Sequence, residues 1–246
     1  MTGDILINLD SEDEGELFIG CAGGANTTAE FTYQPVSAPQ DYFYFRVTVK
    51  GLTGGHSGDD INKGRANANK LLNRFLTQLA SKYILYLCEI DGGNLHNAIP
   101  REAQALCAVP MKDKESVRVD LNIYTAELEN EYAATEPNLR TELSSESPCK
   151  EAIDMTTAGH LLRAVYAVHN GVYAMSQDIP GLVETSSNLA SIKQVEGNKI
   201  KIVTSQRSSI LSSRKNMSEM IRSAFLLGGA EVITGDGYPG LSLIHI

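Results

Sequence analysis

The chain has 246 residues, of which 42% are hydrophobic and 21% charged, values ordinary for a globular protein of one large or two small domains. A net charge of −9 and a pI of about 5.1 disfavour a nucleic-acid partner. No apolar run approaches the roughly 18 residues of a membrane span. The start, "MTGDILINLD", lacks the basic region of a signal peptide, so we expect a cytoplasmic protein without a membrane partner.

The four cysteines, Cys21, Cys88, Cys107 and Cys149, form no CxxC pair and no cluster with zinc-ligand spacing. Cys88 and Cys107 stand in apolar, strand-like runs, where a cysteine is usually a small buried hydrophobe. We expect all four to be reduced and structural; a lone reactive thiol is the alternative.

The first element is a short apolar run, "DILINL" at 4–9, which suits a strand of a parallel sheet and is followed by Asp10. Ligands in α/β enzymes lie at such strand ends. The next carboxylates are too close together for a ready cation site and favour a solvated acidic turn. They are Glu12, Asp13, Glu14 and Glu16.

Strands are expected at 28–36 and at 41–50, the second with clean alternation of apolar residues. The Gly-rich stretch "GLTGGHSGDDINKGRANANK" follows and presents His56. This histidine is either solvated on an ordinary turn or held out on a flexible loop toward a substrate. A helix is predicted over about 64–81, with one apolar stripe. The stripe contains Leu71, Leu72, Phe75, Leu76 and Leu79.

The strands "YILYLCEIDGG" and "REAQALCAVP" come next, then an amphipathic helix over 114–133 and the strand "NLRTELSSES". The buried face of this helix is expected to contain Val117, Leu121, Tyr124 and Leu128. The order over about 41–148 is βαββαβ, the ferredoxin-like pattern.

The remainder reads as a rougher second copy: a helix at 151–169, strands at 183–194 and 199–206, a helix at about 209–227 and a last strand "AEVITG". This copy lacks a first strand, which 28–36 could supply. We therefore predict an α+β fold in which two interleaved ferredoxin-like units form one domain.

Three motifs together resemble the M20 metallopeptidases, in particular the aminoacyl-histidine dipeptidase branch. They are "ILINLDSEDEGELFIGCAGG", "GLTGGHSGDDINKGRANANKLLNRFL" and "GNLHNAIPREA"; "MSQDIPGLVETSSNLASI" adds to the likeness. The resemblance implies two parts: a catalytic domain that holds two divalent metals, usually zinc, and a lid domain inserted into it.

On this resemblance, 1–25 is a remnant of the α/β catalytic domain and 26–236 is the lid, with pseudo-repeats at about 41–148 and 149–236. The stretch 237–246 is a truncated return to the catalytic domain. Its ending, "LSLIHI", looks like translated vector or adapter sequence, so His245 is given no role.

The resemblance implies that Asp10 is a terminal zinc ligand in the complete enzyme. The family's H-x-D motif, bridging Asp, E-E pair and last His have no counterpart here. One carboxylate cannot hold zinc, which takes three or four ligands. The chain alone is therefore expected to bind no zinc stably and to be inactive, and Asp10 in isolation is a solvated strand-end residue.

His56 corresponds to a family histidine that hydrogen-bonds the scissile carbonyl oxygen and stabilises the oxyanion. Asn97, in "HNAIP", matches an asparagine that binds substrate backbone; the alternative is a turn asparagine. Arg207 stands where lids of this family place an arginine that binds the substrate carboxylate; the alternative is a surface ion pair. Asn188 could assist it, and Glu184 could face the substrate amine.

The predicted function is that of a zinc-dependent dipeptidase that hydrolyses Xaa-His, carnosine-like dipeptides with metal-activated water. The expected partners are the dipeptide, the missing catalytic domain and a second copy in a homodimer. Two alternatives stay open: a non-catalytic binding or dimerisation module, and an M20 tripeptidase or deacylase. The GGHSG and N-A-I-P motifs fit the latter too.

Overall fold

The computed structural model describes residues 21–240, so Asp10, the strand predicted at 4–9, the acidic turn and the tail from 241 lie outside the described residues. The strands are β1 (Gly23–Thr32), β2 (Pro35–Ser37), β3 (Tyr42–Lys50), β4 (Gly55–His56), β5 (Tyr86–Gly92), β6 (Ala98–Ile99), β7 (Ala103–Pro110), β8 (Arg140–Ser145), β9 (Glu151–Ile153), β10 (Gly171–Met175), β11 (Val183–Val195), β12 (Lys199–Ser208) and β13 (Glu231–Thr234). The helices are α1 (Ala68–Lys82), α2 (Lys114–Glu131), α3 (Met155–Ala167) and α4 (Leu211–Leu227), with a 3₁₀ turn, η1, at Met111–Asp113.

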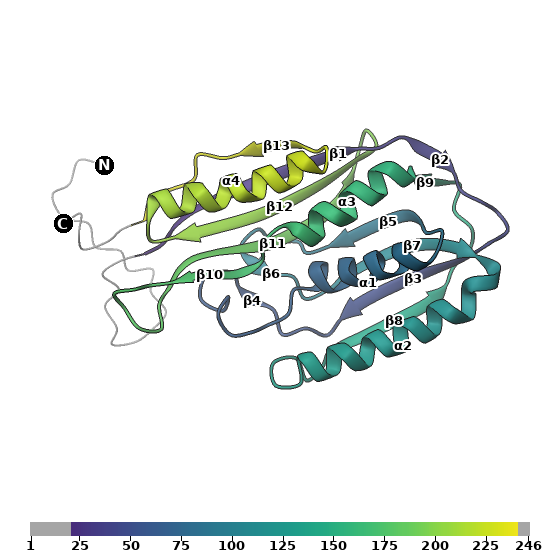
Figure 1. Ribbon diagram of the computed structural model, residues 1–246, viewed down its shortest axis with the longest axis horizontal. Coiled ribbons are helices and arrows are strands. Elements are labelled where there is room, and N and C mark those ends of the chain that lie inside the picture. The colour runs from purple at the N-terminus through teal and green to yellow at the C-terminus, as the bar shows by residue number, and fades with distance from the viewer. Residues whose placement is uncertain (1–20, 241–246) are drawn as a thin grey trace.

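Two ferredoxin-like units share one antiparallel sheet, whose order is β13-β1-β12-β11-β5-β7-β3-β8 (Figure 1). The first unit consists of β3, α1, β5, β7, α2 and β8. The second consists of β1, α3, β11, β12, α4 and β13, so the first unit is inserted after the first strand of the second. The predicted interleaving is therefore confirmed, and β1 supplies the strand that the second copy lacked.

The two units meet edge to edge through their second strands, β5 and β11. Only two residue pairs join these strands: Ile192 with Gly92 and Lys193 with Asp91. Above the sheet, α1 packs on α3 across the same boundary. We call this boundary, the β5–β11 junction with α1 and α3 over it, the seam.

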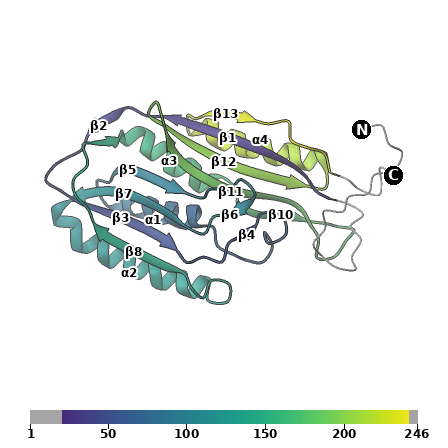
Figure 2. The same cartoon turned by 180° about the vertical axis from the view of Figure 1, so that it is seen from behind.

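All four helices cover one face of the sheet, as the front and back views show (Figures 1 and 2). The main core lies between the two layers and runs through both units without a break. The apolar stripe predicted for α1 and the four residues predicted for α2 are all buried there, which follows from their helical spacing.

Part of the opposite face is covered by a two-stranded ribbon of β2 and β9, which encloses a smaller cluster around Tyr44 and Cys88. The helix predicted from 151 was wrong in its first turn. Glu151–Ile153 pairs with Pro35–Ser37 instead, and α3 starts at 155. Asp154 fixes this start, because its side chain accepts a hydrogen bond from the Thr157 N–H.

The helix predicted from 64 likewise begins later, at Ala68. Asn67 is its N-cap and accepts from the Lys70 N–H at 3.3 Å. The residues from 51 to 67 are thus left as a long connection between β3 and α1. None of the helices within 21–240 is long and apolar enough to cross a membrane.

Candidate functional site

The glycines of the GGHSG motif give its loop the shape that presents His56. Gly54 and Gly55 have φ values of +64° and +141°, a region that residues with a side chain rarely adopt. This turn lets Gly55 and His56 form β4, which pairs antiparallel with Ile99 and Ala98 of β6. The histidine therefore sits on a small ribbon made by two connecting segments of the first unit.

Charged side chains of the same loop fix this ribbon through hydrogen bonds and ion pairs. Asp60 accepts from the His56 N–H at 2.8 Å and forms ion pairs with Lys63 and Arg65. The hydrogen bond from the Lys63 ammonium, with smaller contributions from the His56 N–H and the Arg65 charge, holds the pKa of the Asp60 carboxyl below its usual range. Asp60 is therefore ionised at neutral pH and fixes the backbone of His56.

A second carboxylate closes the loop at its two ends. Glu136 is only 4% exposed, and its two oxygens accept from the Thr53 N–H at 2.6 Å and the Ala66 N–H at 2.8 Å. A buried backbone donor without a partner is costly, so the bond to the buried Ala66 N–H stabilises this loop, and the bond to the exposed Thr53 adds to it.

The ribbon reaches the second unit through a gap beside β11. Along one edge of this long strand, β10 pairs with its residues 183–187 and β5 with 192–193. Between these two partners the edge is met by β6, because the Asn188 side chain donates to the Ala98 carbonyl at 2.8 Å. The ribbon with His56 is thereby brought across the seam.

Across the seam, His56 meets Arg207, 151 residues away in the sequence. The His56 Nε2 and an Arg207 terminal nitrogen are 3.3 Å apart. Gly58 makes the approach possible: a Cβ on this residue would lie 2.9 Å from the guanidinium and 3.2 Å from the imidazole ring. The structure thus brings together one predicted residue from each unit.

The two side chains differ in how far their hydrogen bonds are satisfied. The His56 Nδ1 lies 2.7 Å from a carboxylate oxygen of Asp59, whose side chain is 85% exposed. Arg207 is half-buried, and its Nε is buried with no hydrogen-bond partner among residues 21–240. An arginine with free donors beside an imidazole can bind a carboxylate, which offers matching acceptors for a planar fork of N–H groups.

The other predicted residues lie near this pair in different settings. Asn97 is exposed on the turn before β6, and its carbonyl accepts from the Ser57 N–H at 2.8 Å. Glu184 is half-buried near the start of β11 and accepts from the Thr185 hydroxyl. Asn188 is 1% exposed, and both ends of its amide bond to neighbouring protein groups rather than facing outward.

Arg207 also lies at the end of the sheet where the described chain starts and stops. It pairs with Ser186 on one side and with Gly24 on the other. Gly24 in turn bridges to Tyr238. Both ends of the described chain are therefore in the same row as the arginine, and the cartoon shows them at one end of the molecule (Figure 2).

Three contributors to this site were missed by the sequence analysis: Asp59, Asn67 and Glu136. Asp59 follows His56 by three residues, and this spacing within a Gly-rich turn could have suggested it. Asn67 stands at a helix start, where asparagine is a common cap. Glu136 carried no signal, because it is some 70 residues distant from Ala66, one of the two N–H groups that it binds.

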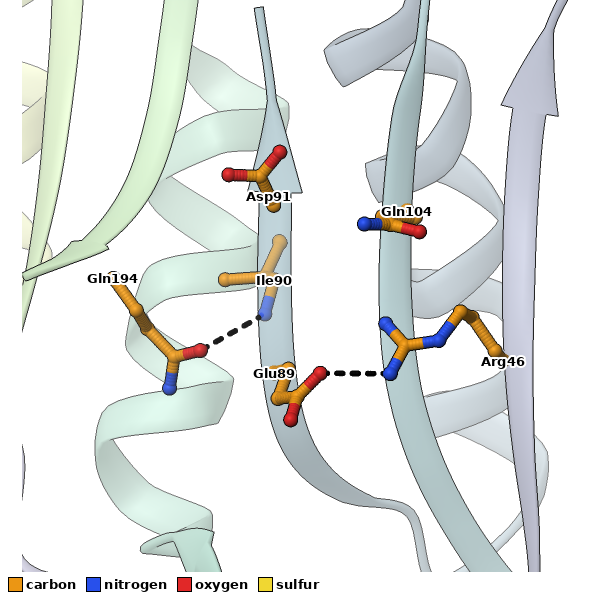
Figure 3. A pocket seen from close by; sticks show the side chains of 6 residues that line it. All are labelled: Arg46, Glu89, Ile90, Asp91, Gln104 and Gln194. Atoms are coloured by element: carbon orange, nitrogen blue, oxygen red, sulfur yellow. Dashed lines mark hydrogen bonds and ion pairs between the residues drawn. The ribbon is translucent and has the colours of Figure 1, made fainter. Parts of the chain in front are cut away.

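The sheet face opposite the helices has a separate hollow of about 200 Å³, at the seam (Figure 3). It is lined by Arg46, Glu89, Ile90, Asp91, Gln104 and Gln194, none of which was predicted as a site residue. Arg46 and Glu89 form an ion pair at 2.8 Å across it, and Gln194 accepts from the Ile90 N–H. These polar groups are already paired with one another.

Within residues 21–240, no three His, Cys, Asp or Glu side chains are grouped closely enough to hold a metal ion. The four cysteines are free, as predicted, and Cys88 and Cys107 are buried. Burial raises the pKa of the Cys107 thiol, so this thiol is inert.

Comparisons with known proteins show what this chain is similar to. Residues 47–136 match the model of the M20_dimer family, the peptidase dimerisation domain. Over 240 residues, or 98% of its length, the chain is 39% identical to the cytosol non-specific dipeptidase of Escherichia coli (strain K12) and covers 49% of that protein.

A solved structure agrees with this relationship. The crystal structure of the aminoacylhistidine dipeptidase from Vibrio alginolyticus matches 98% of this chain with a TM-score of 0.92 and 38% identity. The chain again covers 49% of that structure, so it spans about half the length of both relatives. The predicted resemblance to the M20 peptidases and to their aminoacyl-histidine dipeptidase branch is thereby confirmed.

Proposed function

We propose that this chain is the substrate-binding lid of a zinc-dependent dipeptidase that acts in the cytosol on Xaa-His dipeptides. The observation that carries the proposal is the contact of His56 with Arg207, one from each unit. The resemblance assigns both residues to binding of the peptide substrate. The two relatives are named as dipeptidases. On this proposal, 26–236 is the lid and the stretch up to 25 belongs to the catalytic domain.

Arg207 would bind the carboxylate of the dipeptide. Its Nε has no partner within the described residues, and burial raises the cost of leaving this donor unpaired. A carboxylate with two oxygens can satisfy Nε and a terminal nitrogen at the same time. Such binding would draw the guanidinium away from the His56 Nε2.

His56 would then donate from Nε2 to the scissile carbonyl oxygen and stabilise the charge that develops on it. Asp59, whose carboxylate lies 2.7 Å from Nδ1, orients the ring. A site that is completed only when the carboxylate has taken Arg207 would favour free dipeptides over internal peptide bonds.

Two further residues border the same site. Asn97 is exposed on the turn that leads into the His56 ribbon, where its amide can reach substrate backbone. Glu184 begins the strand that pairs with the Arg207 strand, and its carboxylate could face the substrate amine. Asn188 could still act here, although its amide is occupied in this structure.

Zinc would supply the activated water of the reaction. The described residues offer no three-ligand group for it. Asp10 remains a proposed ligand, outside the described residues. The non-catalytic alternative is favoured by one observation, the match to a dimerisation domain. We therefore also propose that the chain forms a homodimer.

The test is a titration of the 246-residue chain with an Xaa-His dipeptide, followed by NMR at the His56 ring. The dipeptide should shift the His56 signals, and its C-terminal carboxamide should not, because it lacks the charge that Arg207 binds. Arg207→Gln should abolish the shift, whereas Arg46→Gln, at the separate hollow, should leave it unchanged. Equal responses to both peptides would contradict the proposed role of Arg207.

Zinc and hydrolysis are tested in the same samples. We expect no tight zinc binding and no turnover by this chain alone, because zinc needs three or four ligands. Stoichiometric zinc with hydrolysis would mean that a metal site forms from residues not assigned here. Light scattering over a range of concentrations would test the homodimer.

A further inference from the structure

The seam is joined by a chain of asparagine amides, of which Asn67 and Asn188 are buried and Asn170 is half-buried. The Asn67 Nδ2 lies 2.9 Å from the Asn170 Oδ1, 3.2 Å from the Asn188 Oδ1 and 3.0 Å from the Leu189 carbonyl. The Asn170 Oδ1 also accepts from the Leu189 N–H. The amides thus connect the start of α1, in the first unit, to β11, in the second.

Asn188 extends this network to the β4–β6 ribbon that bears His56. Its Nδ2 donates to the carbonyl of Ala98, which is the residue paired with His56 in the β4–β6 ribbon. Its backbone pairs with Ser205 on β12, two residues before Arg207. One side chain therefore links the backbone partner of the histidine to the strand that bears the arginine.

Asn67 acts on the other end of the same loop. Its Oδ1 caps α1, and its Nδ2 reaches across the seam to Asn188. The loop that bears His56 is thus fixed at residue 67 and, through the pairing of His56 with Ala98 of β6, at its ribbon. The β5–β11 pairing offers only two residue pairs to set this relation.

Buried amides suit this task better than apolar contacts. Apolar side chains tolerate small displacements, whereas a buried donor displaced from its acceptor loses its hydrogen bond and keeps its desolvation cost. Asn67 and Asn188 are 3% and 1% exposed, so water cannot replace their partners. A shift of the ribbon along β11 would leave several of these groups unpaired.

We infer that Asn188 and Asn67 are positioning residues that hold His56 in contact with Arg207 across the seam. The importance of this contact for a peptide substrate rests on the proposed function. The positioning itself does not, and it can be measured without any peptide. For Asn188 the inference replaces direct substrate contact with support of the residues that make it.

The test uses NMR on the 246-residue chain. The readouts are the nuclear Overhauser effect between the His56 ring and the Arg207 side chain, and hydrogen exchange of the Ser57 amide, which is bonded to the Asn97 carbonyl. In Asn188→Ala we expect loss of the first signal and exchange about tenfold faster, equivalent to about 1.4 kcal/mol of local stability. Asn67→Ser, which can still cap α1, is the second variant in case Asn188→Ala does not fold. It should weaken the Overhauser effect and speed the exchange of the Ser57 amide.

The matched control is Asn73→Ala. Asn73 is equally buried, lies on α1 and donates to the Leu162 carbonyl of α3, with no bond to the ribbon. This variant should lower global stability and leave both readouts at wild-type values. The inference is overturned if folded Asn188→Ala or Asn67→Ser keeps the wild-type Overhauser effect and exchange rate. It is also overturned if Asn73→Ala changes both readouts as much as these variants do. A failed dipeptide titration with these results intact would contradict only the proposed function.

Discussion

Glu136 is expected to contribute strongly to the stability of the loop at 51–67 that bears His56, although it touches neither His56 nor Arg207. Replacing it with Ala removes the acceptors of two N–H groups at the loop ends. Ala66 is 2% exposed, so its unpaired N–H costs about 1–3 kcal/mol. Thr53 is exposed, and water can replace part of its bond, which leaves a loss of about 0.5–1.5 kcal/mol. Together we expect a loss of about 1.5–4.5 kcal/mol.

Urea denaturation of the 246-residue chain measures this loss. Glu136→Gln keeps only one acceptor for two donors and should lose roughly half as much as Glu136→Ala. The control is Glu142→Ala, because Glu142 pairs with Lys50 at 2.8 Å on the surface, where such a pair contributes under about 1 kcal/mol. If Glu136→Ala is no more destabilising than Glu142→Ala, the role given to the Glu136 hydrogen bonds is wrong.

Three further predictions follow from single contacts. The Lys70 ammonium is buried among the last carbonyls of α3, and desolvation lowers its pKa from 10.5 to about 8. Because the unfolded chain binds more protons between these values, stability should rise with pH from 8 to 10.5, by up to about 3 kcal/mol. In Lys70→Met this rise, measured by urea denaturation at several pH values, should be absent, and a rise of the same size would refute the assignment. Gly58→Ala should displace the guanidinium and remove the His56–Arg207 Overhauser effect with little change in stability, since the new methyl meets a flexible side chain; an unchanged effect would mean that the close approach is not required. The same effect should be independent of protein concentration, because both residues belong to one chain; its loss on dilution would point to a contact between copies.

The sequence was informative wherever the determining pattern was local. The helical spacing in α1 and α2 predicted their buried residues, and the strand alternation of β3 predicted which side chains enter the core. The internal repeat was detected because both copies have the same order of elements.

The errors arose where a distant segment decides the local structure. Glu151–Ile153 reads as the start of a helix, but it pairs with a ribbon strand more than 100 residues earlier. The sequence also carried no sign that the Asn188 amide would donate to Ala98, in the gap between β10 and β5 that the His56 ribbon fills. Neither arrangement could be inferred without the sheet order.

The covalent connection of the two units solves one problem for the proposed site and leaves another. It places the halves at a fixed effective concentration, so no association step is needed to bring His56 to Arg207. It does not fix their register, because a strand junction of two residue pairs tolerates slippage. The seam supplies the missing constraint with polar groups: the asparagine amides, the Lys193–Asp91 ion pair and the Gln194 hydrogen bonds to the backbone of β5. Since each of these needs one specific partner position, they disfavour every register except the one that joins the two half-sites.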